Sequence, residues 1–201
     1  MHMLRSAWSK AISEGLALLK RCRHPFARVV YQLVTGRASH RGEKVELFPL
    51  AEITRSDFCE YIESYNECNK RKISYAYPPT EEALSVMRTD MDGIIYGSRI
   101  YVNENLKNPE QICLLLIHEL THFVRRGIEP YDSPESIFNE ELAAHFAEEL
   151  IWSDKRITRS KLREIALKIS ELYETPMPDK ISIPDYAPLD KAVTALGLKR
   201  A

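Results

Sequence analysis

The stretch Ile112–Gly127, ICLLLIHELTHFVRRG, places two histidines and a glutamate inside an otherwise apolar run. Its flanks predict a helix. Asn108 can cap the first turn, Pro109 suits the position after the cap, and Gly127 can end the last turn. The sequence therefore predicts one long helix that carries ionisable groups on a largely apolar background.

The histidines stand at the spacing that metal binding needs. His118 and His122 are four residues apart, so on a helix both imidazoles lie on one face and can bind one tetrahedral zinc ion. Glu119 is displaced from that face and can reach a water molecule beside the metal, as in the HExxH pattern. Burying these groups unpaired would cost several kcal/mol, which a metal offsets. We therefore predict one Zn²⁺ per chain, with Glu119 as the general base.

A third ligand is expected from the segment 139–152, NEELAAHFAEELIW. Read as a helix, it has one stripe of mainly small residues, which lets two helices approach closely: Glu140, Ala143, Ala144, Ala147 and Ile151. A second, more polar stripe contains Glu141, His145, Glu148 and Trp152. We favour Glu140 over Glu141 as the third ligand, and regard His145 as less consistent with close packing. Either glutamate can instead be a solvated acid in a first helical turn.

The rest of the chain predicts an α+β fold with a small antiparallel sheet. VELFPL and KISYAYPP are typical of short strands, and GIIYGSRIYVN is typical of a hairpin. Further helices are expected over about 4–20, 25–35, 56–68, 81–87, 159–173 and 189–198. We expect three regions: a basic helical segment at 1–44, a domain carrying the metal site at 45–175, and a proline-rich tail with a short helix at 176–201.

Composition limits the function classes. The chain has 201 residues, 44% of them hydrophobic, and a formal net charge of −1, so it can bury one sizeable core. This charge gives no global attraction to nucleic acid or an anionic membrane, although the basic segment 20–44 leaves nucleic acid open. The four cysteines form no CxxC pair, and no signal peptide or membrane span is evident. We expect a cytoplasmic protein with reduced thiols.

Three segments in order resemble the ImmA/IrrE-type metallopeptidases, which belong to the HExxH-plus-Glu zinc enzymes. They are DGIIYGSRIYVN, LLLIHELTHFV and EELAAHFAEELI, and the likeness covers roughly residues 81–152. It implies a zincin-like core in which His118, His122 and Glu140 bind zinc and Glu119 is the base. Thr121 stands where the family commonly has glycine and Ala144 where it commonly has asparagine. These departures bear on the tuning of the site and on its activity.

The resemblance implies a cytoplasmic regulatory protease of the kind associated with phage, mobile elements or stress responses. Such a protease would cleave one protein partner, for example a repressor. The alternative is a zinc-stabilised binding or sensor module that lacks turnover.

Two further predictions concern the substrate of such a protease. Tyr131 is a candidate donor to the oxyanion. The strand of Arg99, Tyr101 and Asn103 can pair with an extended peptide, unless it is an interior strand.

Overall fold

The computed structural model describes residues 10–69, 80–128, 133–153, 156–173 and 175–198. The strand expected in KISYAYPP and the residue Tyr131 lie outside this part of the chain. The described residues form a mostly helical α+β fold with eight α-helices and a three-stranded sheet. The helices are α1 (Lys10–Arg21), α2 (Pro25–Val34), α3 (Arg55–Asn69), α4 (Glu81–Asp90), α5 (Pro109–Arg125), α6 (Pro134–Ser153), α7 (Arg159–Leu172) and α8 (Ala187–Ala195). A short 3₁₀ helix, η1, spans Leu50–Glu52.

The sheet is mixed, which corrects the expected antiparallel arrangement. Its strands are β1 (Glu46–Pro49), β2 (Gly93–Tyr96) and β3 (Arg99–Val102), in the order β1-β3-β2. The predicted hairpin is confirmed, because β2 and β3 pair antiparallel around the turn at Gly97. However, β1 pairs with β3 in parallel. The long connection through α3 and α4 returns the chain in the direction that parallel pairing requires.

The central position of β3 matches the alternative that it is an interior strand. Both of its edges are already paired, so its backbone offers no free edge. The side chains of the predicted contact residues are also engaged within the protein. Arg99 and the Tyr101 hydroxyl bind Asp57 at 2.9 and 3.2 Å, and the Asn103 amide donates to the Met91 carbonyl at 2.9 Å.

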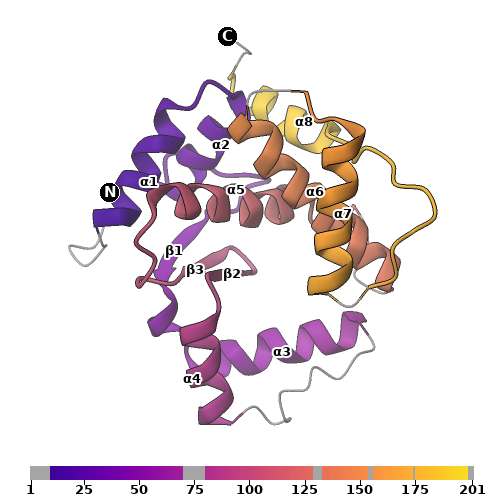
Figure 1. Ribbon diagram of the computed structural model, residues 1–201. Coiled ribbons are helices and arrows are strands. Elements are labelled where there is room, and N and C mark those ends of the chain that lie inside the picture. The colour runs from indigo at the N-terminus through magenta and orange to yellow at the C-terminus, as the bar shows by residue number, and fades with distance from the viewer. Residues whose placement is uncertain (1–9, 70–79, 129–132, 154–155, 174, 199–201) are drawn as a thin grey trace.

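Helix α5 is the centre of the fold. In Figure 1 it runs across the middle of the molecule, with α1, α2 and α8 above it and the sheet below it. The largest core cluster joins these elements, and includes Ile12, Phe26, Ile100, Leu116 and Val193. The approach of α1 is close: a Cβ on Gly15 would lie 3.0 Å from the Pro109 carbonyl oxygen. The basic N-terminal helices α1 and α2 thus pack on the helix that carries HExxH.

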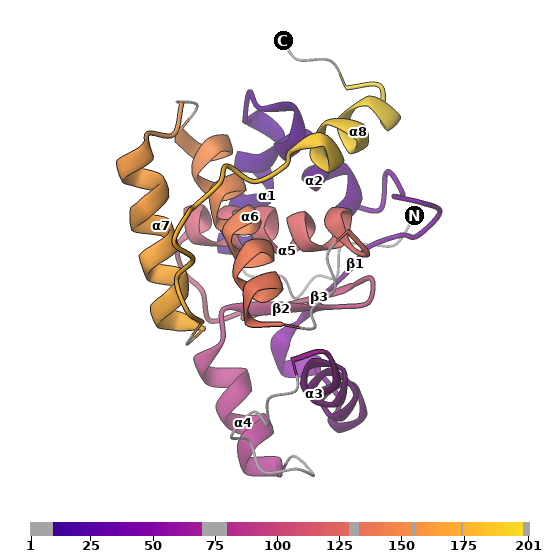
Figure 2. The ribbon, with the colours of Figure 1, turned by 90° about the vertical axis from the view of Figure 1, so that its right-hand side faces the viewer.

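Helices α6 and α7 cover one side of α5 (Figure 2). They share a second cluster that includes Phe138, Phe146 and Ile169. The tail after α7 runs back along this side to α8, and Tyr186 packs on Phe146 with ring centroids 5.1 Å apart. The proline-rich segment therefore wraps the surface before it reaches α8.

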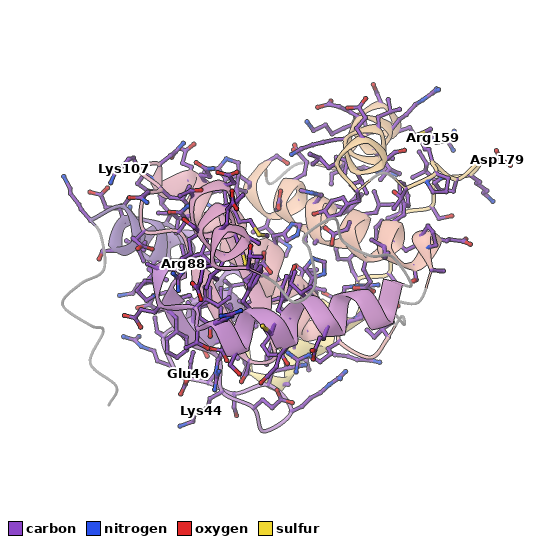
Figure 3. The ribbon with its side chains drawn as sticks, turned by 90° about the horizontal axis from the view of Figure 1, so that it is seen from below. Lys44, Glu46, Arg88, Lys107, Arg159 and Asp179 are labelled. Atoms are coloured by element: carbon purple, nitrogen blue, oxygen red, sulfur yellow. The ribbon has the colours of Figure 1, made fainter. Side chains whose placement is uncertain are left out.

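Helices α3 and α4 lie beneath the sheet and pack around a third cluster that includes Phe58, Ile62, Leu84 and Ile94. In the view from below (Figure 3), α3 crosses in front of the molecule. The labelled Arg88, on α4, lies towards the N-terminal end of α3. Arg88 donates to the Ile53 carbonyl at 2.6 Å, which ties α4 to the start of α3. The labelled Arg159 lies at the far rim, near the start of α7.

Candidate metal centre

The HExxH residues lie in the second half of α5, on a helix whose start is fixed as predicted. The Asn108 side chain accepts from the Glu110 backbone N–H at 2.9 Å, and Pro109 follows the cap. His118 and Glu119 are both less than a tenth exposed. Thr121, one of the departures from the family pattern, is fully buried and donates back to the Ile117 carbonyl at 2.8 Å. Its hydroxyl is thus satisfied within the helix.

Helix α6 turns its polar stripe, and not its small-residue stripe, towards these histidines. Glu141, His145 and Glu148 recur at intervals of four and three residues, so they share one face. All three contact His118: Glu141 and Glu148 approach its imidazole with their carboxylates, and the His145 ring makes an edge-to-face contact with centroids 4.7 Å apart. The site therefore forms between two helices that pack side by side.

Ligand groups of three residues, His118, His122 and Glu141, lie close enough together to bind one metal ion. The Nε2 atoms of His118 and His122 are 3.1 Å apart. The Glu141 carboxylate lies 3.4 Å from His118 Nε2 and 3.6 Å from His122 Nε2. Ligands placed 2.0–2.1 Å from zinc at tetrahedral angles are separated by roughly 3.3–3.4 Å. Each separation is near this value, with Glu141 meeting His118 through Oε2 and His122 through Oε1.

Glu148 holds two imidazoles at once. Its Oε1 lies 2.7 Å from His118 Nδ1, and its Oε2 lies 3.1 Å from His145 Nδ1. A carboxylate accepts, so each Nδ1 carries a proton, and each Nε2 is the ring nitrogen left to face a metal. This is the carboxylate–histidine arrangement that orients metal-binding imidazoles. The sequence pattern places Glu148 on the polar stripe but does not predict this role for it.

Glu140 does not join the histidines, and the geometry reverses the preference for it as third ligand. Its carboxylate is buried against the Arg125 guanidinium, with Nη2–Oε1 at 2.8 Å and Nε–Oε1 at 3.1 Å. Arg125 also donates to the Asp185 carbonyl at 2.7 Å, so this ion pair fastens the tail to α5 and α6. The carboxylate that reaches His118 and His122 belongs to Glu141.

Two buried atoms in the cluster have no hydrogen-bond partner among the described residues: Glu141 Oε2 and His145 Nε2. Leaving a buried polar atom unsatisfied costs about 1–3 kcal/mol, and more for a charged group. The ligand atoms of His118, Glu141 and His145 all lie within 4.8 Å of one another. A buried His–Glu group that could hold a metal ion therefore spans α5 and α6, and the unsatisfied atoms are of the type that ligates metals.

The pKa values of the ionisable groups in the metal-free site shift in different directions. Burial opposes the charge on His118, but the Glu141 and Glu148 carboxylates outweigh it and raise the His118 pKa well above its usual range. Burial lowers the pKa of His122 to about 4. For Glu141 and Glu148, burial is outweighed by the adjacent histidines, and both pKa values fall to about 2. The carboxylates are thus ionised and ready to balance a cation.

Glu119 differs from the other two acids. Burial raises its pKa to about 7, with the negative charges of Glu141 and Glu148 adding to the effect and His118 opposing it. Its carboxylate also accepts a hydrogen bond from the backbone N–H of Ile95 on β2. A buried carboxyl group with a pKa near neutrality is suited to proton transfer at physiological pH.

Tyr173, which ends α7, brings a third helix to the cluster. Its side chain hydrogen-bonds Glu141, and burial together with the charges of Glu141 and Glu119 raises its pKa. Its position was not anticipated, because the predicted donor was the loop residue Tyr131, which lies outside the described residues. The signal that could have located the α6 half of the site was the polar stripe itself, since buried helices seldom present acids and histidine together without a partner.

A pocket of about 200 Å³ opens beside the cluster, between α5, α6 and α7. His145 and Glu148 form one wall, and the wall opposite includes Ile165 and Lys161. Trp152 extends the apolar lining at the end of α6. The buried site is therefore adjacent to a space that a small group or a side chain can enter.

Comparisons with family models, with curated proteins and with solved structures gave no match to this chain. Within the described residues, no helix is both long enough and apolar enough to cross a membrane.

Proposed function

We propose that the chain is a zinc-dependent peptidase in which His118, His122 and Glu141 bind the metal and Glu119 is the general base. The observation that carries the proposal is the convergence of three ligand groups: the two Nε2 atoms are 3.1 Å apart, and the Glu141 oxygens Oε2 and Oε1 lie 3.4 Å from His118 Nε2 and 3.6 Å from His122 Nε2. Because no family model matches the chain, support comes from the site and from the ImmA/IrrE-like segments. The fold proposed for this core is zincin-like.

The roles of the side chains follow from their positions. When bound, zinc supplies a Lewis acid that polarises a carbonyl group and lowers the pKa of a water molecule. Glu119, which is buried beside the ligand groups, would take the proton of the attacking water and return it to the leaving amine. Glu148 keeps the His118 ring in one tautomer. Each of these groups is held by packing, so little reorganisation is needed during the reaction.

The substrate strand is reassigned to β2. Among the described strands, β2 lies at the edge of the sheet and pairs only with β3. Asn103 N–H donates to the Asp92 carbonyl at 2.8 Å, and the alternation of an antiparallel ladder then turns the Ile95 N–H away from β3. That N–H meets Glu119. An extended peptide added along β2 would thus run past the general base.

The substrate proposed is a specific protein partner, as in a regulatory protease that acts on a repressor or stress regulator in the cytoplasm. A second candidate is a zinc-stabilised binding or sensor module. The observation in its favour is His145, a further buried imidazole beside the three ligands, because closed zinc sites with four protein ligands are structural.

Glu119→Gln separates the two candidates, since Glu119 is not among the proposed ligands. A zinc-loaded peptidase should lose at least about 10²-fold in the rate of peptide hydrolysis, measured by mass spectrometry on a diverse peptide library. The exposed Glu110 on the same helix gives the matched control, Glu110→Gln, which should retain the activity. Equal hydrolysis by Glu119→Gln and the wild type would contradict the peptidase mechanism. Absence of hydrolysis by the zinc-loaded wild type would favour the binding module.

A further inference from the structure

The arrangement around His145 remains unexplained by a three-ligand site. Its Nδ1 is held by Glu148 in the way that His118 Nδ1 is held, at 3.1 and 2.7 Å respectively. The lone pair of its Nε2 is therefore free to accept, yet this atom is buried and has no hydrogen-bond partner within the described residues. An imidazole fixed in this tautomer is prepared to bind a metal.

His145 also lies at a suitable distance. Its ligand atom is within 4.8 Å of those of His118 and Glu141, whereas the ligands of one tetrahedral zinc are separated by roughly 3.3–3.4 Å. A movement of the His145 ring would bring its Nε2 to that separation. The pocket of about 200 Å³ that His145 lines gives the ring and its neighbours room for such a movement.

We infer that His145 is an exchangeable fourth ligand, which closes the metal site in the resting protein and withdraws when substrate binds. This inference rests on the proposed function, because it requires the metal to be held by His118, His122 and Glu141. A zinc ion with four protein ligands has no open position for water or a carbonyl group, so the closed form is inactive. Glu148, which contacts both imidazoles, keeps His145 within reach in the open form.

Small anions should bind only weakly to the metal in the closed site. The probe is the full-length protein loaded with Co²⁺ in place of zinc, with its visible absorption followed as sodium azide is added. In the wild type, azide must displace His145, so the spectrum should respond only at high azide. In His145→Ala the fourth position is open to solvent, and the same spectral change should appear at azide concentrations at least about tenfold lower.

Two more variants test whether misfolding or altered packing could explain the result. His145→Gln keeps most of the side-chain volume and should behave as His145→Ala does. Glu149→Gln alters the neighbouring wall of the pocket, where Glu149 lies 3.7 Å from Lys161, and should behave as the wild type does. Zinc affinity, measured by competition with a chromophoric chelator, should fall about tenfold or more in both His145 variants and stay unchanged in Glu149→Gln.

The outcomes separate this inference from the proposed function. Equal azide responses and equal zinc affinities in the wild type and both His145 variants would overturn the role of His145 while leaving the three-ligand site intact. Failure of the wild type to bind Co²⁺ or zinc at all would overturn both. Loss of metal in His145→Ala together with retention in His122→Ala would replace His122 by His145 in the ligand set, and would also overturn the inference.

Discussion

The neighbouring acids Glu140 and Glu141 should respond to the same substitution in different ways. Glu140 is 3% exposed and receives hydrogen bonds from Arg125 Nε and Nη2 at 3.1 and 2.8 Å. Glu140→Gln leaves the buried guanidinium without a counter-charge. Removing one partner of a buried ion pair costs about 3–5 kcal/mol. The metal site contains no contribution from Glu140, so the folded variant should still bind one zinc ion per chain.

Glu141→Gln removes the carboxylate that lies 3.4 and 3.6 Å from the two Nε2 atoms. An amide is a poor zinc ligand, so this variant should lose stoichiometric zinc binding. Urea unfolding in the presence of a chelator gives the stability of each metal-free variant, and elemental mass spectrometry gives its metal content. A domain of ordinary stability, about 5–15 kcal/mol, can lose 3–5 kcal/mol and remain largely folded, which circular dichroism checks.

The reasoning fails if the pattern is inverted. Loss of zinc in folded Glu140→Gln, with retention in Glu141→Gln, would restore Glu140 as the ligand and refute the placement of the polar stripe. A change in unfolding free energy below about 1 kcal/mol for Glu140→Gln would refute the buried ion pair instead.

Further predictions concern the general base, the sheet and the helix cap. Because burial raises the Glu119 pKa to about 7, the folded metal-free protein retains that proton while the unfolded chain has lost it, so the contribution of Glu119 to stability falls as pH rises from about 4.5 to about 7. Glu119→Gln should remove this contribution. At pH 8 its free energy of unfolding, measured with urea, should exceed that of the wild type by as much as about 3 kcal/mol. An unchanged pH profile would count against the burial of Glu119. Gly93→Ala should cost about 1–3 kcal/mol in urea unfolding, because the new Cβ would lie 2.6 Å from the Tyr101 carbonyl oxygen; no loss would mean that β2 is packed more loosely. Asn108→Ala should cost about 1 kcal/mol by loss of the α5 cap, and an equal midpoint would argue against that hydrogen bond.

Helix α5 could be predicted from the sequence because its signals are local. The cap, the proline, the apolar run and the terminal glycine lie within or directly beside it, and the structure places each as expected. The spacing of His118 and His122 needs only helical periodicity to bring the imidazoles together. Within the described residues, the hairpin of β2 and β3 is predictable for the same reason, since a tight turn joins the strands.

The α6 half of the site depends on which way that helix is turned, which is not a local property. The small-residue stripe suggested the face that packs on α5, but buried Arg125 offered Glu140 a counter-charge that the helix pattern does not reveal. Turning the polar stripe inwards places Glu141, His145 and Glu148 around His118. The parallel pairing of β1 with β3 was missed for a similar reason, since it joins segments that are distant in sequence.

Metal content per chain tests the central claim most directly. Protein purified without added metal, and a second sample reconstituted with zinc and desalted, would be analysed by elemental mass spectrometry beside His122→Ala. The account predicts about one zinc ion per wild-type chain after reconstitution and a large loss in the variant, because His122 Nε2 lies 3.1 Å from His118 Nε2 in the ligand cluster. No zinc in the reconstituted wild type, with the fold intact by circular dichroism, would contradict it.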